Sequence, residues 1–250
     1  MMSFDFPSHQ HIQHAMDHDE PVQSFSDRHP VYLYEIDNKD VIVKFVSAEA
    51  AKTHQLNTAL LQFLDVPMVD CDVMKLSNES RDKFYNKPDH LYKYGHLVVM
   101  PFITGSNMLD LTRKNYKFSR AMRDQIVRFI PAMALADYSD LDEENVILQN
   151  SMDICLIDAE IGLLTKKNYH SSIKDLAVNY LSLAFGEAKL TPFEEAKKTQ
   201  IALVQSAAIF RDKINAGLPE PLNRVKNLQE ILLKRTEEMS NSKILVPLYT

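Results

Sequence analysis

Hydrophobic and polar positions follow two different patterns along this chain. In the first hundred residues, short apolar runs rich in β-branched and aromatic residues alternate with polar turns. Residues 31–36 and 41–45 are such runs, and the polar segment 37–40 between them is typical of a hairpin turn. A further β-rich run spans residues 97–103. These segments predict a strand-rich N-terminal part.

Apolar residues recur at helical spacing in the other segments. One helix is predicted to begin after Ser47, a typical N-cap residue, and to stop at Pro67. A second begins at Ser119 and has Pro131 inside its apolar stripe. Because an interior proline costs about 3 kcal/mol, we expect a kink or an early end there. Further helices are predicted after residue 158, at residues 173–183, 191–217 and 225–232.

This order of elements predicts an α+β fold with two lobes. Residues 21–103 form the strand-rich N-terminal lobe, and residues 104–250 form a helical lobe into which two short apolar runs are inserted. At 250 residues the chain is long enough for two lobes that share a cleft.

Residues 1–20 are predicted to be a mobile arm. The arm carries four histidines among acidic residues: His9, His11, His14 and His18. These side chains could ligate a metal, but no spacing between histidine and carboxylate defines a geometry, which favours a solvated tail.

Composition and charge exclude some classes of function. The net charge of −6 argues against a general nucleic-acid binder, since phosphate contacts need clustered Lys and Arg. Two cysteines, Cys71 and Cys155, provide no disulfide framework and indicate a reducing compartment. There is neither an apolar run of transmembrane length nor a Sec signal. We therefore expect a cytoplasmic protein, or one delivered into a host cell by a system that needs no Sec signal.

Candidate chemistry is concentrated between residues 140 and 158. Asp140 and Asn145 are five positions apart and precede a short apolar run, and Asp158 ends a second such run. Two strands joined by a turn would bring these oxygens to one edge, where an amide and a carboxylate suit Mg²⁺. Asp110 and Asn115 have the same spacing, but they lack both the apolar run and the later aspartate.

Residues 139–148 resemble the catalytic loop of the protein-kinase-like superfamily, usually written H-R-D-L-x-x-x-N, and residues 156–160 resemble its strand ending in D-F-G. The resemblance implies that Asp140 is the catalytic carboxylate that aligns the acceptor hydroxyl. It also implies that Asn145 and Asp158 bind Mg²⁺ beside ATP.

Two N-terminal segments extend the resemblance. Residues 41–45 resemble the V-A-I-K strand, and residues 97–105 resemble the hinge strand between lobes. The resemblance implies a bilobal kinase-like fold in which Lys44 contacts the ATP phosphates and assists transfer. It further implies that Met100 and Phe102 frame the adenine.

The chain departs from the family pattern at several places. Residues 22–36 contain no glycine, so the Gly-rich loop is absent, and no A-P-E motif closes an activation segment. The position expected to carry the acidic partner of Lys44 is occupied by Gln55, and Glu49 is a possible substitute. Asp137 is an alternative to Asp140 as the catalytic carboxylate. These departures resemble atypical, minimal kinases of the actin-fragmin-kinase-like or bacterial effector kind.

The sequence therefore predicts an ATP- and Mg²⁺-dependent phosphotransferase, an atypical protein kinase that acts on a Ser/Thr-type hydroxyl of a protein substrate. An activating partner that completes the site is part of this expectation. The alternatives are a pseudokinase-type interaction module, a kinase-fold enzyme acting on a small molecule or lipid, and an enzyme that transfers AMP.

Overall fold

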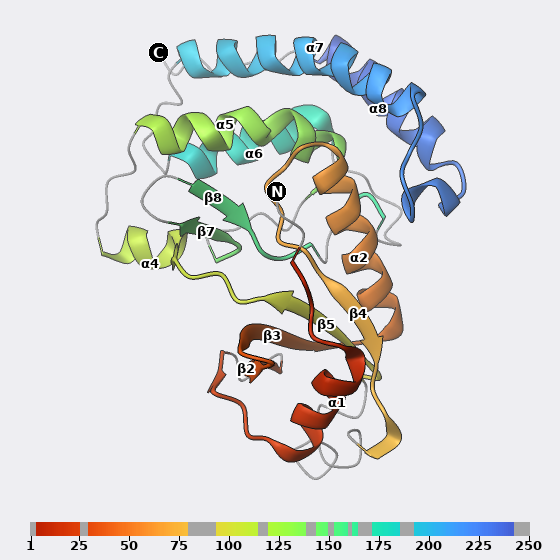
Figure 1. Cartoon of the computed structure of the whole chain (residues 1–250). Coiled ribbons are helices and arrows are strands. Elements are labelled where there is room, and N and C mark those ends of the chain that lie inside the picture. Colours follow the sequence, from red (N-terminus) through yellow and green to blue (C-terminus); the bar gives the residue numbers. More distant parts are fainter. Residues whose placement is uncertain are drawn as a thin grey trace. The chain divides into compact units, whose positions relative to one another are not determined.

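The computed structural model in Figure 1 describes residues 4–25, 30–79, 94–114, 120–138, 144–149, 153–159, 162–164, 172–185 and 193–242. The chain divides into two compact units. The first comprises residues 1–58 and 69–104, and the second comprises residues 59–68 and 105–250. The first unit holds a five-stranded antiparallel sheet, and most of the helices lie in the second, so the α+β class is confirmed.

The sheet of the first unit has the strand order β1-β2-β3-β5-β4. Its strands are β1 (Gln23–Ser24), β2 (Val31–Ile36), β3 (Lys39–Val46), β4 (Asp72–Lys75) and β5 (His96–Pro101). The predicted hairpin is present, and its turn is formed by Asp37 and Asn38, with φ of 54° and 59°. Positive φ at both turn positions suits a two-residue hairpin turn, so β3 begins at Lys39, earlier than predicted.

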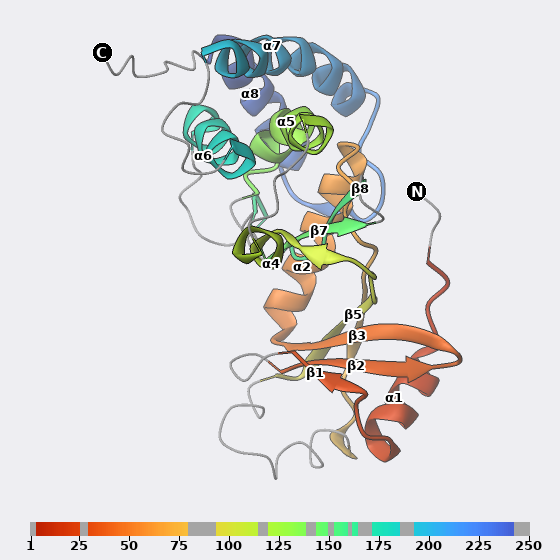
Figure 2. The ribbon, with the colours of Figure 1, turned by 90° about the vertical axis from the view of Figure 1, so that its left-hand side faces the viewer.

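One face of this sheet forms a core with helix α1 (His9–His18), as Figure 2 shows. The helix contributes Ile12, Ala15 and Met16, which are at most 4% exposed. Residues 1–20 were predicted to be a mobile arm, whereas the described part of this segment is a helix packed in the core. The spacing i, i+3, i+4 of the three buried residues is the helical signal that the histidines obscured.

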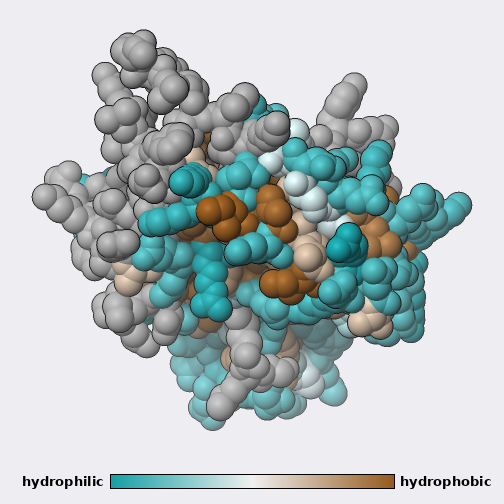
Figure 3. Space-filling model, turned by 90° about the horizontal axis from the view of Figure 1, so that it is seen from above, coloured by the Kyte–Doolittle hydropathy of each residue, from teal (hydrophilic) through white to brown (hydrophobic). Residues whose placement is uncertain are grey.

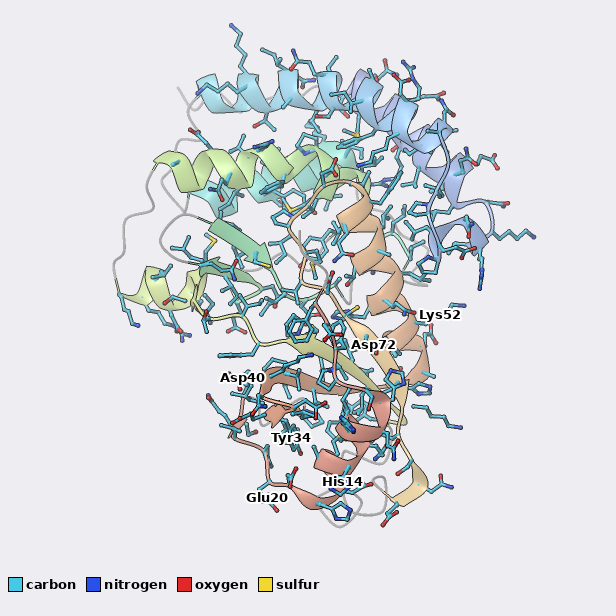
Figure 4. The ribbon with its side chains drawn as sticks, in the orientation of Figure 1. His14, Glu20, Tyr34, Asp40, Lys52 and Asp72 are labelled. Atoms are coloured by element: carbon cyan, nitrogen blue, oxygen red, sulfur yellow. The ribbon has the colours of Figure 1, made fainter. Side chains whose placement is uncertain are left out.

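Two of the α1 histidines are paired with aspartates of the sheet. His9 Nε2 lies 2.7 Å from Asp72 on β4, which Figure 4 labels, and His11 Nδ1 lies 2.6 Å from Asp37 in the β2–β3 turn. These contacts attach the helix to the edge strand β4 and to the β2–β3 turn.

Helix α2 (Ala48–Phe63) begins after Ser47 as predicted, and it ends four residues before Pro67. The Ser47 hydroxyl accepts a hydrogen bond from the Ala50 N–H at 3.1 Å, which caps the first turn. The chain leaves the helix at Asp65, whose φ is 62°, two residues before Pro67.

The second unit consists of a small sheet and a set of packed helices. Its strands are β6 (Ser106–Asn107), β7 (Val146–Gln149) and β8 (Asp153–Leu156). Its helices are α4 (Met108–Arg113), α5 (Arg120–Leu135), α6 (Ile173–Phe185), α7 (Phe193–Asn215), the 3₁₀ helix η2 (Leu222–Arg224) and α8 (Leu228–Asn241). Helix α5 packs against α6, α7 and α8.

We expected a kink or an early end at Pro131; helix α5 continues to Leu135, so the early end is wrong. Ile130, Met133 and Leu135 are at most 2% exposed. Their burial, at about 1.5–3 kcal/mol for each large side chain, outweighs the cost of about 3 kcal/mol for the interior proline.

The outer face of α7 exposes apolar side chains. Ile201, Val204 and Ile209 are 48%, 43% and 64% exposed. Figure 3 shows apolar side chains among hydrophilic ones on the side of the molecule viewed there. Among the described residues, no helix is long and apolar enough to cross a lipid bilayer.

Candidate nucleotide and metal site

Lys44 lies inside the sheet of the first unit, where it is paired with Val31 of β2 and Val98 of β5. Strand alternation places it on the face opposite the α1 core, together with Ile42 and Val46. The lysine is 8% exposed, although a lysine is among the side chains that proteins bury least often. A lysine buried to this extent is unusual, which is consistent with a functional interpretation.

Met100 and Phe102 lie near Lys44 in the same sheet. Met100 is paired with Ile42, two positions from Lys44 on β3. The Phe102 N–H donates to the Asp40 carbonyl at 2.9 Å, which extends the pairing between β3 and β5 by one residue. Alternation therefore places Lys44, Met100 and Phe102 on one face of the sheet.

Phe25 is an aromatic neighbour of Phe102 that the sequence analysis did not identify. The two rings are stacked, with centroids 6.3 Å apart and planes 27° apart. Phe25 is 45% exposed and lies directly after β1, at the start of the hairpin connection that lacks glycine. The sequence did offer a sign of this contact, because Phe25 is an aromatic residue in the hairpin where the family pattern has glycines.

The inner face of α2 differs from the one that the resemblance implies. Gln55, the position expected to carry the partner of the lysine, is exposed, and so is the substitute Glu49. The buried polar residues of this helix instead include His54 and Asn57, at 0% and 2% exposure.

In the second unit, Asn145 and Asp158 lie at the same end of the β7–β8 hairpin. Asn145 immediately precedes β7, and Asp158 follows β8 by two positions. Val146 pairs with Leu156, and the Ile157 N–H donates to the Asn145 carbonyl at 3.1 Å. The expected pair of strands is confirmed, and it brings the two residues together.

These two side chains suit a magnesium ion chemically. Both are partly exposed, and they offer a carboxylate and an amide oxygen, which are ligands that Mg²⁺ accepts alongside water and phosphate. Within the described ranges, no group of three or more His, Cys, Asp and Glu residues is placed to hold a metal. A pair that shares the ion with a triphosphate needs no such cluster.

Asp140 lies outside the described residues. The preceding segment ends at Tyr138, and Asp137 within it is 5% exposed with a φ of 48°. The Asp137 carboxylate lies 3.8 Å from the Arg235 guanidinium, which is itself 4% exposed. This buried ion pair gives Asp137 a structural partner, which argues against the alternative that Asp137 is the catalytic carboxylate.

Arg235 caps the C-terminal end of α5 from helix α8. Its Nε donates to the Leu135 carbonyl at 2.9 Å, and its Nη2 donates to the Ala134 carbonyl at 2.6 Å. Helix-end carbonyls lack partners within their helix, and a cation there also meets the negative end of the helix dipole. Burial lowers the pKa of Arg235, while the Asp137 carboxylate acts in the opposite direction.

The role of Arg235 was missed by sequence reasoning, although a signal existed. Arg235 continues the spacing of Leu228, Leu232 and Met239, all of which are fully buried. An arginine within the apolar stripe of a helix indicates a buried polar contact.

The structure resembles known kinase structures. A Helicobacter pylori proinflammatory kinase, CtkA, matches with a TM-score of 0.51 and 12% identity, over 90% of this chain and 92% of that one. The fold is kinase-like. A structure of WbdD with a kinase inhibitor matches with a TM-score of 0.43 and 15% identity, over 91% of this chain but 47% of WbdD. A scan of protein-family models and a search of curated proteins find no match.

Proposed function

We propose that this chain is an ATP- and Mg²⁺-dependent phosphotransferase, an atypical protein kinase that acts on a Ser/Thr-type hydroxyl. The observation that carries the proposal is the joint position of Asn145 and Asp158 at one end of the β7–β8 hairpin, on a kinase-like fold. Residues 21–103 and 104–250 would be the two lobes, and ATP and Mg²⁺ the cofactors.

The residues of the first unit would bind the nucleotide. Lys44 provides a positive charge suited to the α- and β-phosphates. Met100 and Phe102, on the same sheet face, provide an apolar surface for the adenine. The burial of Lys44 supports this role, because lysines are rarely buried and a binding site is a reason to hold one within a sheet.

The residues of the second unit would bind the metal and orient the acceptor. Asn145 and Asp158 would hold Mg²⁺, which when bound neutralises negative charge on the phosphate oxygens. Asp140 would accept a hydrogen bond from the acceptor hydroxyl and align its oxygen for attack.

The test is transfer of label from ATP in a cell extract supplied with Mg²⁺. The γ-phosphate label should appear on a protein and should be lost in Asp158→Ala and Asp140→Ala. The matched control is Asp110→Ala, since Asp110 has the same spacing to an asparagine and lies exposed on α4. Unlabelled protein in every extract and buffer, with the chain folded, would contradict the proposal.

Two alternatives have distinguishable outcomes in the same assay. Transfer of label from the α-phosphate instead of the γ-phosphate would indicate AMP transfer, and label on a small molecule or lipid would indicate another acceptor. A pseudokinase is favoured by the exposed Gln55 and by the lack of glycine in residues 22–36. It would bind ATP without transfer, and Asp140→Ala would change nothing.

The partner and compartment are also proposals. The partners would be a protein substrate and an activating protein that compensates for the absent Gly-rich loop. The site of action would be the cytoplasm, either of the producing cell or of a host cell into which the protein is delivered.

A further inference from the structure

Helix α1 carries a pair of histidines that lies outside the proposed nucleotide and metal site. His14 and His18 are four positions apart on α1, so they lie on one face of the helix, one turn apart. Their ring centroids are 4.4 Å apart, and the ring planes are tilted by 56°. Both residues are exposed, and Figure 4 labels His14. The two imidazoles therefore lie beside each other at the surface.

The ring nitrogens of this pair are available to a ligand from solution. The other two histidines of α1, His9 and His11, are engaged in ion pairs with aspartates of the sheet. Within the described ranges, His14 and His18 contact each other through their rings and make no hydrogen bond or ion pair with another residue. The four histidines of α1 thus fall into two pairs with different surroundings.

The backbone that carries His14 and His18 is ordered without any ligand. Ile12, Ala15 and Met16 of the same helix are at most 4% exposed in the core of the first unit. The Ser8 hydroxyl accepts a hydrogen bond from a helix N–H at 3.2 Å, which caps the first turn. A ligand that binds to a helix already held in this way has little backbone left to order, which favours binding.

An imidazole pair at this spacing suits a transition-metal ion. Neutral imidazole is a ligand for Zn²⁺, Cu²⁺ and Ni²⁺, and two histidines at i and i+4 on a helix bind Zn²⁺ in the metalloprotease motif. Two Zn–N bonds of about 2.1 Å need nitrogens within about 4 Å of each other. Rings with centroids 4.4 Å apart reach that separation by side-chain rotation.

The charge around the pair also favours a cation. His18 lies in the last turn of α1, at the negative end of the helix dipole. Asp19 and Glu20 follow it directly, and both are exposed. Negative charge at this end of the helix raises the local concentration of a divalent ion.

We propose that His14 and His18 form a binding site for a borderline divalent transition-metal ion, Zn²⁺ or Cu²⁺, with water in the other coordination positions. No group of three or more His, Cys, Asp and Glu residues is placed to hold a metal in the described part of the chain, so this site has two protein ligands. The ion links two successive turns of α1. The site belongs to the first unit and is independent of the proposed phosphotransferase function.

The first test is calorimetric titration of the full chain with Zn²⁺ in excess Mg²⁺, which occupies oxygen sites and leaves imidazoles free. His14→Gln and His18→Gln should each weaken Zn²⁺ binding at least about tenfold, because the two ligands no longer act together. The matched controls, His9→Gln and His11→Gln on the same helix, should keep the wild-type Kd. Absence of Zn²⁺ binding in the wild type, or an equal loss in all four variants, would overturn the proposal.

The second test restores the spacing at another place on the helix. Gln10 is exposed and stands four residues before His14, so Gln10→His in the His18→Gln chain recreates a pair at i and i+4. Zn²⁺ binding should return to the wild-type level, and its continued absence would contradict a site built by helical spacing. With Cu²⁺ as the probe, electron paramagnetic resonance should show coupling to two nitrogens in the wild type and to one in His18→Gln. The same spectrum from both chains would also overturn the proposal.

Discussion

The rings of Phe25 and Phe102 are stacked with centroids 6.3 Å apart, which joins the first hairpin of the sheet to the end of β5. Phe25 belongs to that hairpin because its N–H donates to the Val31 carbonyl at 3.0 Å. The family pattern has glycines in this hairpin connection, whose backbone covers the phosphates. The present chain has an exposed aromatic ring there, which suits contact with a flat, apolar group such as a purine.

The first prediction concerns adenine binding at this aromatic pair. Phe25→Ala should weaken ATP binding about fivefold, because stacking of aromatic rings contributes about 1 kcal/mol. The chain has no tryptophan, so Phe25→Trp creates a single fluorescent reporter whose emission ATP should change. The control is Phe4→Trp, which labels the α1 core. The same ATP response from both tryptophans would contradict a local stack.

The second prediction concerns Lys44. Lys44→Met should lower phosphoryl transfer by about 10²–10³-fold, the usual loss when a group that stabilises transferred charge is removed. The matched control is Lys52→Met, because Lys52 is an exposed lysine on α2, labelled in Figure 4. Rates of γ-phosphate transfer for both variants check the prediction. An unchanged rate of γ-phosphate transfer in Lys44→Met would contradict the role of Lys44 in the site.

The third prediction concerns the buried pair of Arg235 and Asp137. Arg235→Met should lower the free energy of unfolding by about 3–5 kcal/mol, because it removes a buried cation that contacts the Asp137 carboxylate and two helix-end carbonyls. Arg224→Met is the control, since the Arg224 side chain is 79% exposed and pairs with Glu220 on the surface. Urea denaturation measures both. A loss below about 1 kcal/mol for Arg235→Met would be inconsistent with this cap.

A fourth prediction tests whether α1 belongs to the core. Ile12→Ala should lower the free energy of unfolding by about 2–5 kcal/mol, because Ile12 is fully buried among the residues of the sheet. Val22→Ala removes a side chain that is 65% exposed and should change the stability by less than about 0.5 kcal/mol. Denaturant unfolding compares the two variants. Equal stability of Ile12→Ala and the wild type would contradict the packing of α1 in the core and would support a mobile arm.

The fifth prediction concerns alkaline pH. Burial raises the pKa of Tyr180, with the Asp137 carboxylate adding to the shift, and burial also raises the pKa of Tyr34 on β2. The folded state keeps these protons where the unfolded chain loses them, so stability is full below about pH 10 and falls as the pH rises above it. Tyr180→Phe removes one such group, and its stability should decline less steeply above pH 10. Unfolding at several alkaline pH values measures both slopes, and identical slopes would contradict this linkage.

Much of the local structure could be predicted from the sequence. The runs at 31–36 and 41–45 form adjacent strands joined by the predicted turn, because short-range composition and turn chemistry determine such hairpins. Asn145 and Asp158 lie together for the same reason, since they flank two strands joined by a short connection. The roles of Asp140 and of the metal-binding pair stay predictions.

The contacts that hold these parts in place could not be predicted, because they join residues far apart along the chain. Arg235 binds a carbonyl 100 residues before it, and no periodicity encodes which helix end it will meet. Phe25 and Phe102 likewise meet only when the sheet is assembled.

The sequence by itself determined the β2–β3 hairpin, the hairpin that carries Asn145 and Asp158, and the kinase resemblance, since each depends on residues close together or on ordered motifs. Only the tertiary structure decided that α1 lies in the core, that α5 passes Pro131, and that Tyr138 bonds to Asp158. Those outcomes depend on how much surface distant segments bury together, and a local pattern does not contain that quantity.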